Sequence, residues 1–274
     1  MPVDHYNGGN EHNTRHLIYS RFWHKALYDL GIVNTPEPYK KRTTNGLLMG
    51  SDGKKMSKSR GNGFMVADLV ASVGADAARV TVLSLGPWDL NVNWSDGALA
   101  GVQRFLKRVE AMSDNLSDAP MTAEQERLMH QLIADMTERI ENMRFNTAIS
   151  AMMEYINAFS GAPMPRAAYD ALVRVMAPFA PHLAEEMWEK LGNADMLALA
   201  PWPTFDAAKL VKTEMALVAS VNGKRAAEFT MPTAATEADV IAAAKVAAGA
   251  KLDGVTIIKT IVVPNKLVNF VIKK

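Results

Sequence analysis

The spacing of apolar residues changes along the chain, and the first stretch mixes two patterns. Residues 16–30 place large apolar side chains three or four positions apart, which predicts a helix, and Gly31 supplies its C-terminal stop. The short apolar run Gly46–Met49 predicts a strand. It leads through the turn residues 51–53 into a polar loop over 54–62, so the first stretch combines helix, strand and loop.

Helical periodicity dominates the middle of the chain. Apolar residues recur at helical spacing in four windows, 96–112, 128–140, 146–159 and 166–191. Thr122 and Gln125 have the spacing of a capping box, whereas Pro178 and Pro181 interrupt the last window and Gly192 ends it. We expect a helical bundle with methionines filling its core and with Trp188 and His182 packed between helices.

The last stretch returns to a period of two. Met215–Val221 and Lys224–Thr230 flank Asn222-Gly223, the strongest signal for a type I′ hairpin. A helix capped by Thr236 and Asp239 should run to Gly249. Two further strands, 256–263 and 267–272, surround a turn at Pro264 and Asn265. The pattern predicts a small α+β module with the order β-β-α-β-β.

Composition narrows the class of protein. The chain has 274 residues, no Cys, 49% hydrophobic and 22% charged residues, which exclude a disordered chain, a disulfide framework and any zinc site built from Cys. No apolar run is long enough for a membrane span, and we expect no signal peptide. The absence of Cys is consistent with a protein of the reducing cytoplasm.

The net charge of +1 conceals an asymmetry between segments. Residues 1–62 carry a net charge of +5, residues 63–204 carry −8, and residues 205–274 carry +4. Basic ends are suited to phosphate groups, although ordinary scatter of surface charge is the alternative interpretation.

Two clusters are candidates for chemistry. In the first, Gly8 and Gly9 precede Glu11 and His12, a pattern that lets a backbone approach a polar or anionic ligand; a plain tight turn is the alternative. His12 and His16, four residues apart and beside Glu11, also suggest one face of the metal site of a hydrolase, but no third ligand stands at a suitable spacing, so we expect no bound metal.

The second cluster is the basic loop Gly53–Asn62, with four cations, two hydroxyls and flanking glycines. Such a loop can fold over a polyphosphate, its lysines neutralising developing charge. It is not a Walker loop. A solvated basic loop or a general nucleic-acid patch would show the same composition.

As an ordered string, Lys55-Met56-Ser57-Lys58-Ser59 is identical to the second signature of class I aminoacyl-tRNA synthetases. The surrounding residues resemble leucyl-tRNA synthetases in particular. The strings that carry the resemblance are Met1-Pro2-Val3-Asp4, Gly8-Gly9, Glu11-His12, His16-Leu17-Ile18-Tyr19-Ser20-Arg21-Phe22, Gly74-Ala75-Asp76-Ala77-Ala78-Arg79, Trp94, Arg104-Phe105-Leu106-Lys107-Arg108, Arg144-Phe145-Asn146-Thr147-Ala148, Pro178-Phe179-Ala180-Pro181-His182, Trp202-Pro203, Val221-Asn222-Gly223-Lys224-Arg225, Asp253-Gly254-Val255, Val263-Pro264 and Lys266-Leu267-Val268-Asn269.

The resemblance implies an enzyme that joins leucine to tRNA(Leu) with ATP, releasing AMP and pyrophosphate. It places Gly8, Gly9, Glu11 and His12 in the adenosine pocket. It also implies that Lys55 and Lys58 hold the ATP phosphates, within an ATP-binding loop that includes Met56, Ser57 and Ser59. ATP is the substrate, Mg²⁺ is expected with it, and no structural zinc is expected in this chain. Lys58 is the residue we expect to matter most.

The chain also departs from the family. The other class I signature, a His-x-Gly-His string, is absent, as are the first half of the fold and the editing insertion. The link 47–54 leaves no room for a small domain that some bacterial members insert there. We therefore expect leucine binding only with the missing half, which a complementary N-terminal subunit could supply, and an inactive isolated chain. Met1 matches a position inside the family's motif, which favours a fragment or a truncated gene over a true split subunit.

These inferences give a mixed fold in four segments. We expect the second half of a Rossmann-like α/β nucleotide-binding fold at 1–62, a helical link at 63–95, a tRNA-binding bundle of the anticodon-binding type at 96–204, and a small α+β tRNA-binding domain at 205–274. Lys224, Arg225, Lys259 and Lys266 are candidates for tRNA contacts, unless they are merely solvated. The alternative function is a non-catalytic tRNA-binding protein derived from a synthetase.

Overall fold

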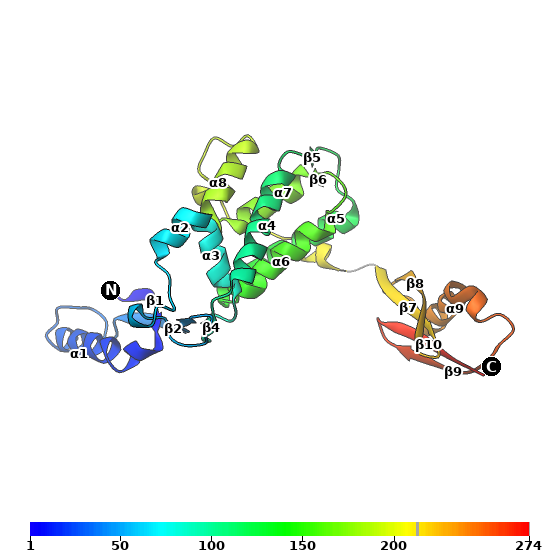
Figure 1. The fold of residues 1–274 in the computed structure, drawn as a ribbon, viewed down its shortest axis with the longest axis horizontal. Coiled ribbons are helices and arrows are strands. Elements are labelled where there is room, and N and C mark those ends of the chain that lie inside the picture. Colours follow the sequence, from blue (N-terminus) through cyan, green and yellow to red (C-terminus); the bar gives the residue numbers. More distant parts are fainter. Residues whose placement is uncertain (212–213, 274) are drawn as a thin grey trace. The chain divides into compact units, whose positions relative to one another are not determined.

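The computed structural model describes residues 1–211 and 214–273, which fall into two units (Figure 1). The first is Met1–Asp206 and the second begins at Ala207, near the boundary expected at 204–205. The side chains of Lys58, Glu214 and Ala250 lie outside the described part of the structure. The predicted mixed fold is confirmed, because a parallel α/β segment, a helical bundle and an α+β module follow one another along the chain.

The N-terminal segment is a strand–helix–strand unit. Strands β1 (Val3–Gly9) and β2 (Tyr39–Asn45) pair in parallel around helix α1 (His16–Asp29), and a short 3-10 turn, η1 (Asn10–Asn13), follows β1. The apolar periodicity predicts the helix but neither strand, because both strands are rich in polar and charged residues. Among the described residues, these two strands pair only with each other.

Helix α1 leaves most of its apolar face exposed. Ile18, Phe22 and Trp23 are 61%, 73% and 59% exposed. An ion pair holds the helix to the chain ahead of β2, because Arg21 and Lys25 both contact the carboxylate of Glu37. Hydrogen bonds from Arg21 and then Lys25 lower the pKa of Glu37 to about 2. The helix is thus held by charged groups while its apolar side chains face water.

Strands β3 (Leu48–Met49) and β4 (Val92–Asn93) form a short parallel pair. The linking helices α2 (Val66–Val73) and α3 (Ala75–Ser84) lie between these two strands in the sequence. The predicted strand 46–49 is therefore shorter than expected. Gly46 is the reason: a Cβ there would collide with the carbonyl of Leu90, so this residue serves close backbone approach instead.

The bundle contains the main core of the first unit. Its elements are α4 (Asp96–Met112), β5 (Leu116–Ser117), α5 (Ala123–Glu141), α6 (Phe145–Ala158), β6 (Met164–Pro165), α7 (Arg166–Met176), α8 (Pro181–Lys190) and η3 (Leu197–Leu199). Figure 1 shows α4 to α7 together in the bundle, where α5 packs against both α6 and α7. Met136, Met152 and Met176 are fully buried, as predicted for the methionines. The break at the two prolines and the Thr122–Gln125 capping box are also confirmed.

Hydrogen bonds between two segments about a hundred residues apart connect α3 to the start of α8. The Asp76 carboxylate accepts hydrogen bonds from the Leu183 amide at 2.7 Å and from His182 Nδ1 at 2.8 Å, while Arg79 donates to the Pro178 carbonyl at 3.1 Å. Asp76 thereby satisfies an amide at the open end of α8. The expectation that His182 packs between helices was wrong, because its side chain is 75% exposed and only its Nδ1 edge is engaged.

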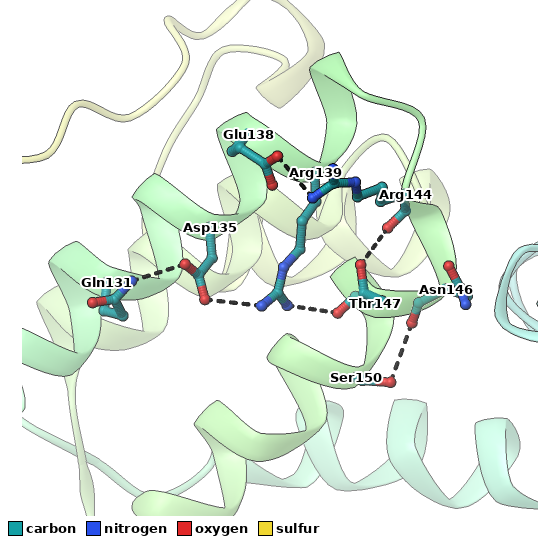
Figure 2. A network of polar contacts seen from close by, with 8 residues as sticks. All are labelled: Gln131, Asp135, Glu138, Arg139, Arg144, Asn146, Thr147 and Ser150. Carbon is teal, nitrogen blue, oxygen red and sulfur yellow. Dashed lines mark hydrogen bonds and ion pairs between the residues drawn. The ribbon is translucent and has the colours of Figure 1, made fainter. Parts of the chain in front are cut away.

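A methionine in the left-handed conformation forms the corner between α5 and α6. Met143 has a φ of 56°, and the bonds Met143 N to Ile140 O and Arg144 N to Arg139 O close a Schellman motif. Figure 2 shows the polar network that braces this corner, in which Arg139 donates to the Thr147 carbonyl at 2.7 Å. At the ends of α1 and α8, by contrast, Gly31 and Gly192 take the positive φ, as predicted.

The second unit is a four-stranded sheet covered on one face by a helix. The sheet order is β8 (Lys224–Pro232), β7 (Glu214–Val221), β10 (Leu267–Lys273) and β9 (Thr256–Val263), with β7 and β10 parallel. Helix α9 (Glu237–Ala248) packs on Leu217, Val268 and Phe270; the short 3-10 turns are η4 (Ala207–Leu210) and η5 (Gly249–Lys251). Asn222 and Gly223 have φ of 48° and 77°, which confirms the predicted type I′ turn.

No helix in residues 1–211 and 214–273 has both the length and the apolar character needed to cross a membrane.

The left-handed Met143 gives a stability prediction. Met143→Gly should raise the free energy of unfolding of the first unit by about 0.5 to 1 kcal/mol. Glycine adopts the left-handed conformation without a Cβ clash, and this gain exceeds the cost of the larger backbone entropy that glycine loses on folding. Chemical denaturation followed by Trp fluorescence reports on the first unit alone, since all five Trp lie within it. Met143→Ala, which keeps a Cβ, should show no such gain; an equal gain would mean that the backbone conformation is not the cause.

Candidate nucleotide-binding site

The glycine pair ends strand β1 at the edge of the α/β segment. Gly8 and Gly9 lie opposite Thr44 and Asn45 of β2, and Glu11 and His12 follow in η1 with exposed side chains. A Cβ on Gly9 would meet only the Glu11 carboxylate, the end of an exposed side chain that can move aside, and the φ of Gly9 is −60°, so neither a close contact nor the backbone conformation requires glycine there. All four predicted adenosine-pocket residues therefore lie together where β1 runs into η1.

His16 belongs to an aromatic cluster at the same edge. Its ring stacks on Tyr6 with centroids 5.5 Å apart, and its Nε2 lies 3.3 Å from the Tyr39 hydroxyl. Tyr6 and Tyr39 are themselves 4.4 Å apart, centroid to centroid. Across the described residues, no three His, Cys, Asp or Glu side chains come together as a metal site would require, so the interpretation of Glu11, His12 and His16 as a hydrolase centre finds no ligand set there.

The signature loop is closed at its base by one side chain. The amide of Asn62 donates to both carboxylate oxygens of Asp52, at 3.1 and 3.2 Å, and its carbonyl oxygen accepts from the Ser57 backbone amide at 3.0 Å. Gly50 makes the crowding possible, since a Cβ there would lie 2.7 Å from Asp52 Oδ1. The loop is thus tied across its neck, and the segment from Lys55 to Ser59 lies between the tied residues Asp52 and Asn62.

Asp52 is an anion held among donors. The backbone amide of Lys54 and the side chain of Asn62 keep the pKa of the Asp52 carboxyl below its usual value. A carboxylate that stays ionised offers stable acceptors for the loop's own N–H groups. Its role in the loop is therefore to hold the backbone.

The segment from Lys55 to Ser59 mixes exposed and half-buried side chains. Lys55 is exposed, and its ammonium has no ion-pair partner in the part of the chain that the structure describes, although its backbone bridges to Met49. Met56 and Ser57 are half-buried, and the hydroxyls of Ser57 and Ser59 lie 3.3 Å apart. The Lys58 side chain is outside the described residues. An unpaired ammonium beside hydroxyls and backbone amides can meet phosphate oxygens.

The four predicted tRNA contacts lie in the second unit, all exposed. Lys224 and Arg225 begin β8, and Lys259 lies on β9 opposite Val271. Lys266 stands in the turn ahead of β10, and β8 and β9 are the two edge strands of the sheet, so Lys224 and Arg225 lie on the opposite edge from Lys259. Arg225 is also engaged by Glu228 in an ion pair.

Two family models match the chain. The model described as tRNA synthetases class I (I, L, M and V) matches residues 17–95, and the one described as the anticodon-binding domain of tRNA ligase matches residues 126–242. Both belong to the same kind of enzyme and follow in the order that the structure shows. The chain belongs to the class I aminoacyl-tRNA synthetases. The loop and the bundle of this synthetase chain thus have counterparts in its family.

Solved structures agree with this assignment. A LeuRS from Agrobacterium radiobacter, solved as a ternary complex with tRNA and LeuAMS, matches all of this chain with 31% identity and a TM-score of 0.73. This synthetase chain spans 39% of that protein's length. Methionyl-tRNA synthetase from Mycobacterium tuberculosis, in complex with methionyl-adenylate, matches 70% of this chain and 45% of its own, with 19% identity and a TM-score of 0.53, a likeness of fold.

Sequence reasoning missed two polar residues in this part of the synthetase. Asn62 was only the end of the predicted loop, yet it ties the loop's neck. Nothing in the sequence marks Arg42, yet its Nη2 donates to the Gly9 carbonyl at 3.2 Å. An asparagine after a glycine in a polar loop gives a weak signal, and an arginine in a polar strand gives none, because only the fold brings each to its partner.

The tie at the loop's neck can be tested by titration. Asn62→Ala should raise the pKa of Asp52 part of the way toward its ordinary value of 3.8, because one of its donors is lost while the Lys54 amide remains. Carboxyl-carbon NMR across the acidic range measures the shift. Asn115→Ala, an exposed asparagine after α4, serves as the control and should leave Asp52 unchanged. An Asp52 pKa that ignores the loss of Asn62 would contradict the tie.

Proposed function

We propose that this chain is the C-terminal part of a leucyl-tRNA synthetase, contributing the ATP-binding loop and tRNA-binding domains to the ATP-dependent attachment of leucine to tRNA(Leu). The observation that carries the proposal is the match of the whole chain to LeuRS at 31% identity, with the string Lys55–Ser59 intact. The likeness to the methionyl enzyme supports only the shared fold. The absence of Cys is consistent with a cytoplasmic enzyme.

In this proposal the leucine carboxylate attacks the α-phosphate of ATP, forming leucyl-adenylate and releasing pyrophosphate. The leucyl group then passes to the 3′ end of the tRNA, and AMP leaves. Gly8, Gly9, Glu11 and His12 line the adenosine pocket, and their position where β1 runs into η1 supports the assignment. No covalent bond to the enzyme is needed, so positioning and charge stabilisation provide the rate.

The signature loop supplies the charge stabilisation. Negative charge grows on the leaving pyrophosphate, and Lys55 and Lys58 are assigned to meet it, with Met56, Ser57 and Ser59 shaping the loop around the phosphates. Mg²⁺ is expected to arrive with ATP. The exposed Lys55 ammonium and the tied neck at Asn62 support a loop that presents cations from a fixed base.

Leucine binding is assigned to the half of the nucleotide-binding fold that is not in this chain. The exposed apolar side chains of α1 support this division, because a parallel α/β layer is normally covered on both faces. On its own, the chain is proposed to be inactive.

The remaining segments are assigned to tRNA. Residues 63–95 link the loop to the bundle at 96–204, and residues 205–274 form the second tRNA-binding module, with Lys224, Arg225, Lys259 and Lys266 at its surface. Recognition by such surfaces relies on shape and phosphate contacts. The match to the anticodon-binding domain supports the assignment of the bundle.

A second candidate is a non-catalytic tRNA-binding protein derived from a synthetase. The net charge of +4 on residues 205–274 favours it, together with the anticodon-binding match. The two candidates differ in one respect: only the first gains activity when the missing half is supplied.

Pyrophosphate exchange tests the proposed function. This chain, mixed with a separately made N-terminal half of a leucyl-tRNA synthetase, should catalyse leucine-dependent exchange between ATP and pyrophosphate, which neither half does alone. In that mixture Lys58→Ala should lower the rate by about 100-fold, the scale of one lost charge stabiliser.

Lys107→Ala, which removes an exposed lysine of α4, is the control and should leave the exchange rate unchanged. No gain on mixing would remove the catalytic proposal and leave the non-catalytic one. An undiminished rate for Lys58→Ala would remove the loop from the mechanism.

A further inference from the structure

Both ends of the signature loop are attached to one buried tryptophan. The backbone amide of Trp94 donates to the carbonyl of Met49, which precedes the loop, at 2.9 Å. The Trp94 ring packs against Phe64, which follows the loop, with centroids 4.5 Å apart. Its indole N–H donates to Asp96 at the start of α4 at 2.8 Å. Trp94 is only 9% exposed, so the chain on both sides of the loop is held on a buried support next to the bundle.

Above this support, the side chain of Asn62 connects three parts of the loop. Its amide nitrogen donates to the Asp52 carboxylate, and its carbonyl oxygen accepts from the Ser57 amide at 3.0 Å. The same nitrogen approaches the carbonyl oxygens of Lys54 and Lys55 at 3.5 and 3.4 Å. We call the Asp52 carboxylate, the Asn62 side chain and the Ser57 amide the clasp.

The clasp restricts the part of the loop that carries the signature lysines. Residues 53–61 lie between Asp52 and Asn62, and the bond to the Ser57 amide divides them into two shorter segments, 53–56 and 58–61. A shorter segment between fixed points has fewer conformations to lose when the loop is ordered. Lys58 directly follows the fixed amide, and the backbone of Lys55 is bridged to Met49. Both lysines therefore have a fixed point of the backbone at or beside them.

The clasp uses the negative charge of the loop without using its positive charges. The segment 54–60 carries four cations: Lys54, Lys55, Lys58 and Arg60. Asp52 is the only acidic residue in positions 38–67. Its carboxylate accepts from the Asn62 amide and from the Lys54 backbone N–H, and neither donor is an ammonium group. Holding the loop in this way leaves the Lys55 ammonium available to phosphate oxygens.

The contacts of the clasp are exposed to water, which limits what they add to the stability of the fold. A hydrogen bond of this kind exchanges with bonds to water, so its net contribution to folding is small. Catalysis, in contrast, is sensitive to the position of a charge, since a displacement of about 1 Å can cost about 100-fold in rate. Loss of the clasp should therefore affect the loop's position more than the folding of the first unit.

We propose that Asn62 is a positioning residue for the activation of leucine, because its clasp with Asp52 and the Ser57 amide holds Lys55 and Lys58 where they meet the phosphates of ATP. This inference rests on the proposed function, since it takes activation as the reaction. Asn62 contacts no reacting atom in this role and acts through the two lysines. The clasp forms and breaks no covalent bond, so the bond changes of activation stay as described above.

The first test follows leucine-dependent pyrophosphate exchange by the full chain mixed with the N-terminal half of a leucyl-tRNA synthetase. Asn62→Ala removes the bonds to Asp52 and to the Ser57 amide, and kcat should fall about tenfold because the lysines are less well placed. The KM for leucine should not change, since the leucine pocket is assigned to the other half. A kcat equal to that of the parent chain would overturn the inference.

A double-mutant cycle separates positioning from a purely structural role. If Asn62 acts through the signature lysines, adding Asn62→Ala to Lys58→Ala should cost less than about threefold, because one of the groups it positions is already gone. Loss of folded protein would instead multiply the two effects and make the double variant about 1,000-fold slower than the parent chain. Such a multiplied loss would overturn the positioning role.

Exchange of the two partners tests whether the clasp is the means of positioning. Asn62→Asp alone faces the Asp52 carboxylate with a second one, so kcat should fall at least about tenfold at neutral pH. Adding Asp52→Asn restores one amide and one carboxylate, and an oxygen at position 62 can still accept from the Ser57 amide. The rate should then return to within about threefold of the parent chain. No recovery in the exchanged pair would contradict the clasp.

Asn142→Ala is the matched control. The Asn142 amide also donates to a carboxylate, Glu138 Oε1 at 3.1 Å, and to the Glu138 carbonyl at 2.8 Å, at the end of α5. Its replacement removes a similar contact from another element and should leave the exchange rate unchanged. Melting curves followed by Trp fluorescence should place Asn62→Ala and Asn142→Ala within about 4 °C of the parent chain.

The failure of the proposed function looks different. If the mixture that contains the parent chain shows no exchange, activation is not a reaction of this chain, and the positioning role falls with the proposed function. If that mixture is active while Asn62→Ala keeps the full kcat, the proposed function stands and only the positioning role is overturned.

Discussion

A pair of parallel strands is stable only as part of a larger layer, and this constraint governs the first unit. Strands β1 and β2 pair with each other alone among the described residues, while α1 exposes Ile18, Phe22 and Trp23 to water. Parallel strands are normally flanked by further strands and covered on both faces, because open edges and bare apolar faces are unfavourable. Gly8 and Gly9 end β1 and belong to this layer. The conformation of the candidate nucleotide site is therefore stable only when other polypeptide covers β1 and α1.

The bundle, in contrast, is complete in itself and offers a rigid support. Its core buries large residues such as Tyr169 and Phe179, and polar contacts fix the ends of its helices: Asp76 caps α8 from α3, and a Schellman motif with Met143 turns α5 into α6.

Local signals predicted the elements that depend on local physics. The capping boxes, the Asn222-Gly223 turn and the glycine stops of α1 and α8 are confirmed, since each depends on residues a few positions apart. The strands β1 and β2 were not visible in the periodicity, because their stability comes from pairing. The sequence also did not predict the tie of Asn62 to Asp52, because residues ten positions apart in a polar loop meet only once the loop is folded. The sequence did not predict the corner between α5 and α6, because Met143 stands at the left-handed position where helix ends usually carry glycine.

Amide hydrogen exchange of this chain, alone and mixed with the N-terminal half of a leucyl-tRNA synthetase, tests the central claim most directly. The claim is that β1 and α1 are completed by another part of the nucleotide-binding fold. Peptides from β1 and α1 should exchange fast in the isolated chain and markedly slower in the mixture, while peptides from α6 and α7 should exchange slowly in both. Exchange in β1 and α1 that is already slow in the isolated chain, or that does not change on mixing, would contradict the account.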